Sequence, residues 1–145
     1  MRLLTGANNV IDNYHGNIVI TDESDIILAR KTIREISGRL GFSLTDVTRI
    51  VTATSELARN ICLYAGSGVM SWRYLERGNE VGIEMTFEDH GPGIADPELA
   101  MQEGYSTGSG LGLGLPGSRR LMDELEIRSR VGEGTTVIVK KWRRY

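Results

Sequence analysis

The chain has 145 residues, of which 40% are hydrophobic and 25% charged, and its formal net charge is -2. This length corresponds to one domain that can bury a core without disulfides or metal, and the slight acidity argues against a general nucleic-acid binder. One cysteine excludes an internal disulfide. The sequence shows no signal peptide and no apolar run long enough to span a bilayer. We therefore expect a cytoplasmic protein that binds neither nucleic acid nor membrane.

The first half of the chain predicts one strand and two amphipathic helices. Residues 1–16 are rich in Gly and Asn and predict an irregular lead-in, whereas residues 17–21 predict a strand. From Asp22 to about Leu40, apolar residues recur at steps of three and four and predict a helix. A second helix is predicted from Ser43, which can cap it, to the stop at Gly66.

The second half predicts four strands, one helix and a long loop. Two hairpins are expected, because glycine turns at Gly78 and at residues 132–134 separate strand-like stretches. The elements are strands at 69–75 and 80–88, a helix at 113–124, and strands at 125–130 and 135–142. This order predicts a two-layer α/β (α+β) sandwich: a mixed, mostly antiparallel sheet with helices on one face. The loop of roughly twenty residues before the third helix is longer than ordinary connections, as functional lids often are.

Three motifs that could form a binding or catalytic site come before the last two predicted strands. Glu56 and Asn60 are four residues apart, so they share a face of the second predicted helix, opposite its apolar stripe. Alone, this pair also fits two solvated side chains. Asp89, followed by Gly91 and Gly93, combines an acceptor carboxylate with flexible backbone after a strand. A plain turn has the same composition.

The third motif is a run of alternating glycines, from Gly108 to Gly114, that opens a helix. Free N–H groups in such a run, together with a helix N-terminus, favour a bound phosphate. The interleaved leucines do not fit a flexible Gly/Ser linker. The spacing matches neither a Walker A loop nor a Rossmann fingerprint, and the motifs of eukaryotic-type protein kinases are absent. Thr135, in the last hairpin, has a hydroxyl that could also reach a nucleotide base.

In this order the motifs resemble the site signature of the GHKL ATPase superfamily, whose nucleotide-binding domain is the Bergerat fold. Within it, the sequence resembles the stressosome switch kinases of the RsbT type from about residue 17 to the C-terminus. The likeness is carried by residues 55–61, 88–94, 104–107 and 112–117, and by the ending from Gly132 to Trp142. The resemblance implies one kinase domain over residues 17–145, with an ATP lid at about 94–110.

The resemblance also implies a role for each motif residue. Glu56 would be the general base, Asn60 would bind a magnesium ion, and Asp89 would bind the adenine amino group of ATP. Gly93 would let the base approach, and Gly91 would belong to the same nucleotide site. The remaining nucleotide contacts would come from Gly108, Gly110, Leu111, Gly112, the N–H of Leu113, and Thr135.

By the same resemblance, the substrate is a Ser or Thr hydroxyl on a STAS-domain antagonist. Phosphorylation would release the kinase to activate a second partner, often a PP2C-type phosphatase, in a stress response. One alternative is an anti-sigma factor kinase that sequesters a sigma factor. A sensor histidine kinase core would need a phospho-accepting histidine on an upstream helical hairpin, which neither His15 nor His90 supplies. A pure interaction protein would need a degenerate nucleotide site, whereas every motif is intact.

Overall fold

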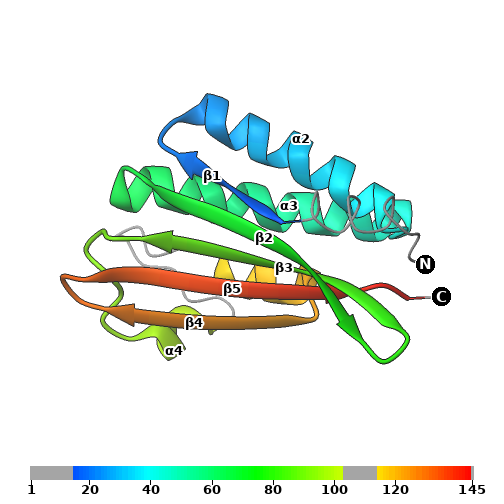
Figure 1. The fold of residues 1–145 in the computed structure, drawn as a ribbon. Coiled ribbons are helices and arrows are strands. Elements are labelled where there is room, and N and C mark those ends of the chain that lie inside the picture. The colour runs from blue at the N-terminus through cyan, green and yellow to red at the C-terminus, as the bar shows by residue number, and fades with distance from the viewer. Residues whose placement is uncertain (1–14, 103–113, 145) are drawn as a thin grey trace.

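The computed structural model describes residues 15–102 and 114–144, and it has two layers (Figure 1). One layer holds the long helices α2 (Glu23–Arg39) and α3 (Leu44–Asn60). A π-helix at Ile61–Ala65 directly follows α3. The other layer is a sheet. Its strands are β1 (Gly16–Ile20), β2 (Gly68–Arg77), β3 (Glu80–Asp89), β4 (Glu124–Arg130) and β5 (Gly134–Trp142). Two short helices, α4 (Pro97–Ala100) and α5 (Leu115–Leu121), lie between β3 and β4 in the chain.

The five strands form one sheet in the order β1-β2-β3-β5-β4. The predicted two-layer fold with helices on one face of the sheet is confirmed, and each of the four strand pairings between described residues is antiparallel. The central place of β3 matters for the site. The ends of β3 and β5 lie side by side, with Asp89 opposite Thr135.

The two long helices begin at polar capping residues, as their sequences predict. The Asp22 carboxylate accepts hydrogen bonds from the backbone N–H groups of Ser24 and Asp25, and Asp25 in turn accepts from the N–H of Asp22. Ser43 accepts from the N–H of Asp46 at the start of α3. Such caps satisfy backbone donors that the first helical turn leaves free.

The core lies between the helices and the inner face of the sheet. Ile33, Ile50 and Leu57 from the helices are at most 2% exposed, and so are Ile83 and Met85 from β3. Along the middle of β3 and β5, buried residues alternate with half-buried ones, as expected for the two faces of a strand. This burial gives the two layers their main stabilisation.

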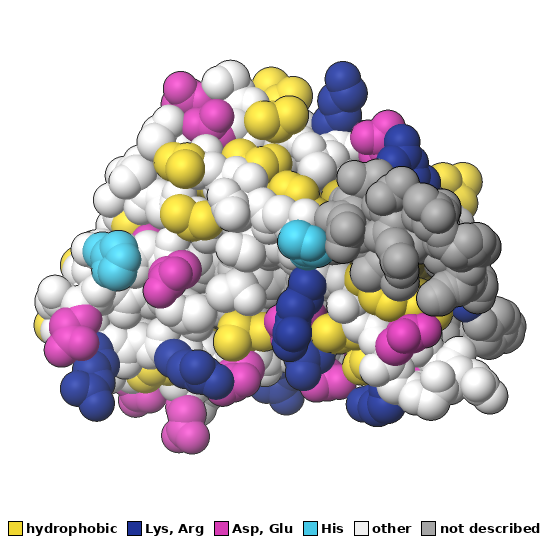
Figure 2. Space-filling model, viewed as in Figure 1, with side chains coloured by type: hydrophobic (Ala, Val, Ile, Leu, Met, Phe, Trp, Pro, Cys, Tyr) yellow, Lys and Arg dark blue, Asp and Glu magenta, His cyan; other side chains and the backbone are white. Residues whose placement is uncertain are grey.

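The outer face of the sheet is mostly polar, and one row of four charged residues crosses it. Arg73, Glu84, Lys140 and Glu124 lie directly opposite one another on β2, β3, β5 and β4. Arg73 contacts Glu84 at 2.6 Å, and Lys140 lies 3.8 Å from Glu84 and 3.9 Å from Glu124. We call this set the charge row. Figure 2 shows acidic and basic side chains interspersed over the lower strands of the face it views.

The structure differs from the predicted elements in three places. The second predicted helix changes to a π-helix at Ile61, because its last turn widens. The third predicted helix, 113–124, is shorter, with bounds Leu115–Leu121, and β4 begins at Glu124. Helix α4 lies within the predicted loop, where Asp96 caps it and Pro97 begins it. The predicted lead-in at 1–16 and lid at 94–110 lie partly outside the described ranges, and β1 already includes Gly16.

The part of the chain that the structure describes holds no helix long and apolar enough to cross a membrane.

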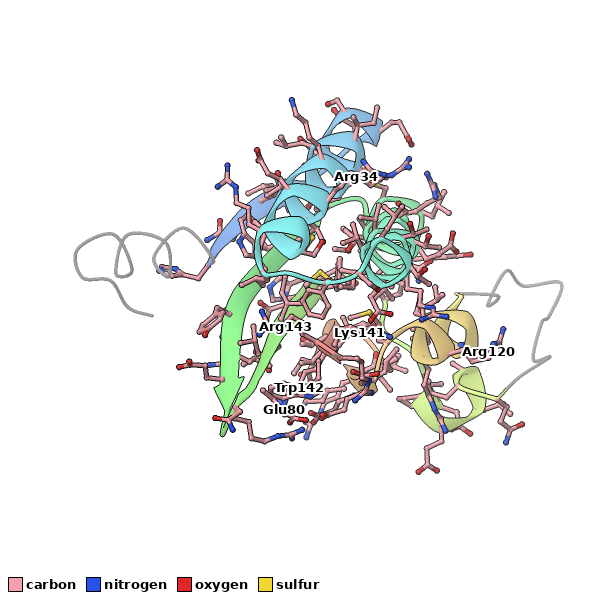
Figure 3. The ribbon with its side chains drawn as sticks, turned by 90° about the vertical axis from the view of Figure 1, so that its right-hand side faces the viewer. Arg34, Glu80, Arg120, Lys141, Trp142 and Arg143 are labelled. Carbon is pink, nitrogen blue, oxygen red and sulfur yellow. The ribbon has the colours of Figure 1, made fainter. Side chains whose placement is uncertain are left out.

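A buried lysine joins three elements near the end of β5 that lies opposite to Thr135. Lys141 on β5 is 6% exposed, and its ammonium donates to the backbone carbonyl of Leu121 at 2.9 Å. The same group lies 3.7 Å from Asp46 at the start of α3 and 3.6 Å from Asp123 after α5. Figure 3 shows Lys141 on the helical side of the sheet, whereas Trp142 lies on the other side.

Replacing Lys141 should destabilise the protein far more than replacing its neighbour. Lys141→Met removes the buried ammonium and its hydrogen bond to Leu121, while Asp46 keeps Arg49 and Asp123 keeps Arg144. We therefore expect a loss of about 2 kcal/mol in the free energy of unfolding. Lys140→Met removes only the outer ion pairs of the charge row, with an expected loss below about 1 kcal/mol. Urea unfolding of both variants at pH 7 measures the difference. Equal losses would contradict a structural role for the buried ammonium.

The stability that the start of α2 contributes to the fold should decrease at acidic pH. The pKa of the Asp25 carboxyl lies below its ordinary value of 3.8, mainly because the Thr21 hydroxyl and then the Thr21 N–H donate to it. A lowered pKa stabilises the fold above pH 3.8, and this contribution is lost as the pH falls through the lowered value. The stability difference between wild type and Asp25→Asn should therefore shrink between pH 5 and about pH 3. Urea titrations showing a constant difference over that range would contradict this origin.

Candidate functional site

One pocket opens between the C-terminal end of α3 and the adjoining ends of β3 and β5. It has a volume of about 630 Å³ counted out to its open mouth. Its walls are mostly apolar, and a few polar groups converge on it, as in small-molecule sites. The lining residues are Leu57, Asn60, Ile61, Tyr64, Phe87, Asp89, Pro92, Gly93, Ile94, Leu115, Ile127, Thr135 and Val137.

Asn60 reaches the pocket from the last residue of α3. The π-helix follows directly and ends at Gly66, whose φ of 85° is in the left-handed region. Its wider turn carries Ile61 and Tyr64 onto the same pocket wall as Asn60. Turns of this kind are frequent at functional sites. Ordinary helical spacing did not reveal this turn, so Tyr64 was missing from the predicted site.

Glu56 lies one helical turn before Asn60 but does not line the pocket. Its side chain is 48% exposed, and Arg59 approaches it at 3.9 Å while also approaching Glu23 at 3.6 Å. A Cβ added to Gly114 would lie 2.8 Å from Glu56 Oε2. The carboxylate therefore lies beside the backbone that leads into α5, at the outer edge of the site.

Asp89 ends β3, and its carboxylate is held by two backbone donors. Oδ1 accepts from the N–H of Gly91 at 2.9 Å and from the N–H of Thr135 at 3.3 Å. These bonds come from the loop after β3 and from β5, so they fix the carboxylate at the place where both meet. Ionised carboxylates only accept hydrogen bonds, so Asp89 offers the pocket an acceptor.

Gly93 is required by the packing of the loop as well as by its place in the pocket. Its φ is 78°, and a Cβ there would overlap the backbone carbonyl of Arg130. The loop is tied to the same hairpin by the N–H of Gly132, which donates to the carbonyl of Pro92 at 2.8 Å. Any side chain at residue 93 would therefore separate the loop from the hairpin.

Ser129 is a site residue that the motif order did not predict. Its Oγ lies 2.7 Å from the N–H nitrogen of Ile94, 3.0 Å from the carbonyl of Gly134 and 2.8 Å from Oγ1 of Thr135. It thus joins the loop to the hairpin just behind Thr135. A sequence signal exists: strand alternation places Ser129 on the inner face of β4, where Leu125 and Ile127 are apolar.

The predicted site residues divide into three groups. Asn60, Asp89, Gly93 and Thr135 line one pocket although they come from three separate stretches of the sequence. Gly91 lies behind it, where a Cβ would meet Ala65 at 2.6 Å, and Glu56 lies at its edge. The remaining predicted residues are outside the described ranges: Gly108, Gly110, Leu111, Gly112 and Leu113. Within residues 15–102 and 114–144, no three His, Cys, Asp or Glu residues cluster as a metal site would require.

The chain is similar to known ATPase-type proteins over most of its length. Residues 45–144 match the family of histidine kinase-, DNA gyrase B-, and HSP90-like ATPases. The serine/threonine-protein kinase RsbT of Bacillus subtilis is 47% identical over 125 residues, 86% of this chain and 94% of that protein. The anti-sigma F factor of Anoxybacillus flavithermus is 34% identical over 116 residues, 75% of this chain and 78% of that protein.

Solved structures show the same fold at low sequence identity. The RsbU and RsbW domains of Rv1364c from Mycobacterium tuberculosis align with a TM-score of 0.55 and 20% identity, over 90% of this chain but 33% of theirs. The catalytic domain of histidine kinase ThkA aligns with a TM-score of 0.51 and 16% identity, over 89% and 97% of the two chains. Family match, relatives and fold agree: the chain belongs to the histidine kinase-, DNA gyrase B-, and HSP90-like ATPase family and, within it, to the serine/threonine kinases of the RsbT type.

Proposed function

We propose that this kinase binds ATP in the pocket and transfers its γ-phosphoryl group to a Ser or Thr hydroxyl of a STAS-domain protein. One observation carries the proposal. Asn60, Asp89, Gly93 and Thr135, which come from three separate segments, line a single mostly apolar pocket.

The adenine base fits the apolar inner part of the pocket. Phe87, Ile94 and Val137 supply walls that exclude water, and the Asp89 carboxylate, oriented by Gly91 and Thr135, accepts from the amino group of the base. A hydrogen bond to an oriented charge is stronger than one between neutral groups. These contacts would provide recognition of the base and leave the phosphates directed toward Asn60.

Asn60 is the residue that would hold magnesium. Its side-chain amide oxygen is a ligand type that suits the ion, because Mg²⁺ takes oxygen ligands and usually needs only one or two from the protein beside phosphates and waters. When bound, the ion would neutralise charge on the phosphates.

Glu56 is placed to act on a protein substrate. Its exposed carboxylate at the edge of the pocket is open to a Ser or Thr side chain from another protein. In the proposed reaction, the substrate hydroxyl oxygen forms a bond to the γ-phosphorus and the bond from that phosphorus to the β–γ bridging oxygen breaks. The hydroxyl proton passes to Glu56, and ADP leaves with the electron pair of the broken bond.

The relatives suggest two partner systems for a cytoplasmic kinase of this kind. Identity to RsbT is higher than identity to the anti-sigma F factors, 47% against 34% or less among the relatives compared. This favours a switch kinase that phosphorylates a STAS-domain antagonist, is released, and activates an effector such as a PP2C-type phosphatase. The second candidate, supported by the anti-sigma relatives, is a kinase that also sequesters a sigma factor.

Glu56→Gln should abolish phosphoryl transfer without loss of ATP binding. The amide keeps the size of the side chain but cannot take a proton, so we expect at least a 100-fold lower rate. The measurement is phosphate incorporation into a STAS-domain protein from the same genome, followed by mass spectrometry. Glu35→Gln, on the exposed face of α2, is the matched control and should leave the rate unchanged. A Glu56→Gln rate near wild type would remove Glu56 from the mechanism.

Asp89→Asn should weaken ATP binding while preserving the fold. Its carbonyl oxygen can still accept from Gly91 and Thr135, but an amide donor replaces the second acceptor. We expect the dissociation constant for ATP to rise roughly tenfold to a hundredfold, as when a hydrogen bond to a charged group is lost. Calorimetric titration measures it, with Glu88→Gln on the outer face of β3 as control. Unchanged ATP affinity would exclude Asp89 from base recognition.

A binding assay separates the two partner systems. The purified protein is presented with a STAS-domain protein and with a sigma factor from the same genome, each with Mg-ATP and with Mg-ADP. The switch-kinase function predicts binding and phosphorylation of the STAS protein alone. Stable capture of the sigma factor would establish the second candidate instead.

A further inference from the structure

Ser129 has a hydrogen-bond arrangement that fixes the direction of a neighbouring proton. Three groups surround its hydroxyl: the Ile94 N–H at 2.7 Å, the Gly134 carbonyl at 3.0 Å and the Thr135 hydroxyl at 2.8 Å. A serine hydroxyl has one proton to donate and two lone pairs that accept. The N–H can only donate and the carbonyl can only accept.

Only one assignment makes all three contacts hydrogen bonds. Ser129 accepts from Ile94 and donates its single proton to the carbonyl of Gly134. Its remaining lone pair must then accept the proton of Thr135. The Thr135 hydroxyl therefore has no proton left for another partner, and Oγ1 can only accept.

This matters because Thr135 and Asp89 line the same pocket side by side. They are cross-strand partners, and the Thr135 N–H donates to the Asp89 carboxylate. With the proton of Thr135 directed to Ser129, both side chains present acceptors. The amino group of a ligand has two protons and can donate one to each side chain. A carbonyl oxygen at the same place can only accept, so it would face the acceptors of Asp89 and Thr135 without a hydrogen bond.

We propose that Ser129 is a positioning residue that makes Thr135 an obligate acceptor and thereby helps the site to select 6-amino purines over 6-oxo purines. The inference rests on the proposed function, since it requires the nucleotide base to bind in this pocket. It assigns base selectivity to a side chain that acts through Thr135.

The test measures the dissociation constants of ATP and inosine triphosphate, which carries a carbonyl oxygen at position 6 in place of the amino group. Titrations use the full chain as wild type, Ser129→Ala, Thr135→Val and the double variant. In Ser129→Ala the Thr135 hydroxyl is free to rotate and donate to the carbonyl oxygen. The preference for ATP should then fall about three- to tenfold, the factor associated with one neutral hydrogen bond. Ser129→Thr retains the hydroxyl and should restore the preference.

The double variant decides whether Ser129 acts through Thr135. If it does, adding Ser129→Ala to Thr135→Val should leave the preference where Thr135→Val alone puts it. Thr136→Val is the matched control, because it removes a hydroxyl from the adjacent residue on the opposite face of β5. Thermal melting checks that each variant folds.

The outcomes separate the inference from the function on which it rests. If wild type binds no ATP, the proposed function fails and the inference fails with it. If wild type prefers ATP and Ser129→Ala keeps the full preference, the role of Ser129 is overturned while ATP binding stands. A loss that Ser129→Thr does not restore, or that persists undiminished in the Thr135→Val background, also overturns it.

Discussion

The contact between the loop after β3 and the β4–β5 hairpin is the constraint on which the site depends. It consists of the Asp89 carboxylate bonded to the backbone of Thr135, the Gly132 N–H bonded to Pro92, and Gly93 packed on the backbone of Arg130. These groups leave no room for a side chain at residue 93. The same contact sets the direction of the Asp89 carboxylate and the entrance to the loop, so the proposed base recognition and the loop geometry share one origin.

The two-layer fold brings the other half of the site to this contact. Burial of one face of α3 against β3 holds the helix over the sheet, and its final turns overhang the ends of β3 and β5. Asn60 ends α3 at the pocket, and the π-helix that follows places Ile61 and Tyr64 on the same pocket wall. A rigid core thus positions polar groups from α3, and the hairpin contact positions those from the sheet.

Much of this arrangement could be predicted because the informative signals are local. Helix periodicity, capping residues and glycine turns indicated the layers, and the order of the motifs indicated the residues that meet in the pocket. Three features could not be predicted in this way. The π-helix has the composition of an ordinary helix end, α4 is a single turn that Asp96 caps, and the role of Ser129 depends on a contact with Ile94, 35 residues earlier in the chain.

The charge row on the outer face of the sheet bears on how the strands find their alignment. A slip of two residues between neighbouring strands keeps every inward side chain inward, so hydrophobic burial alone discriminates weakly against it. In the native alignment, Glu84 lies opposite both Arg73 and Lys140. A two-residue slip of β3 against both neighbouring strands would place Thr86 or Gly82 opposite those cations, and neither cation would then lie opposite Glu84. Electrostatic pairing on the solvated face therefore supplies alignment information that the core lacks, and dissolved salt would weaken it.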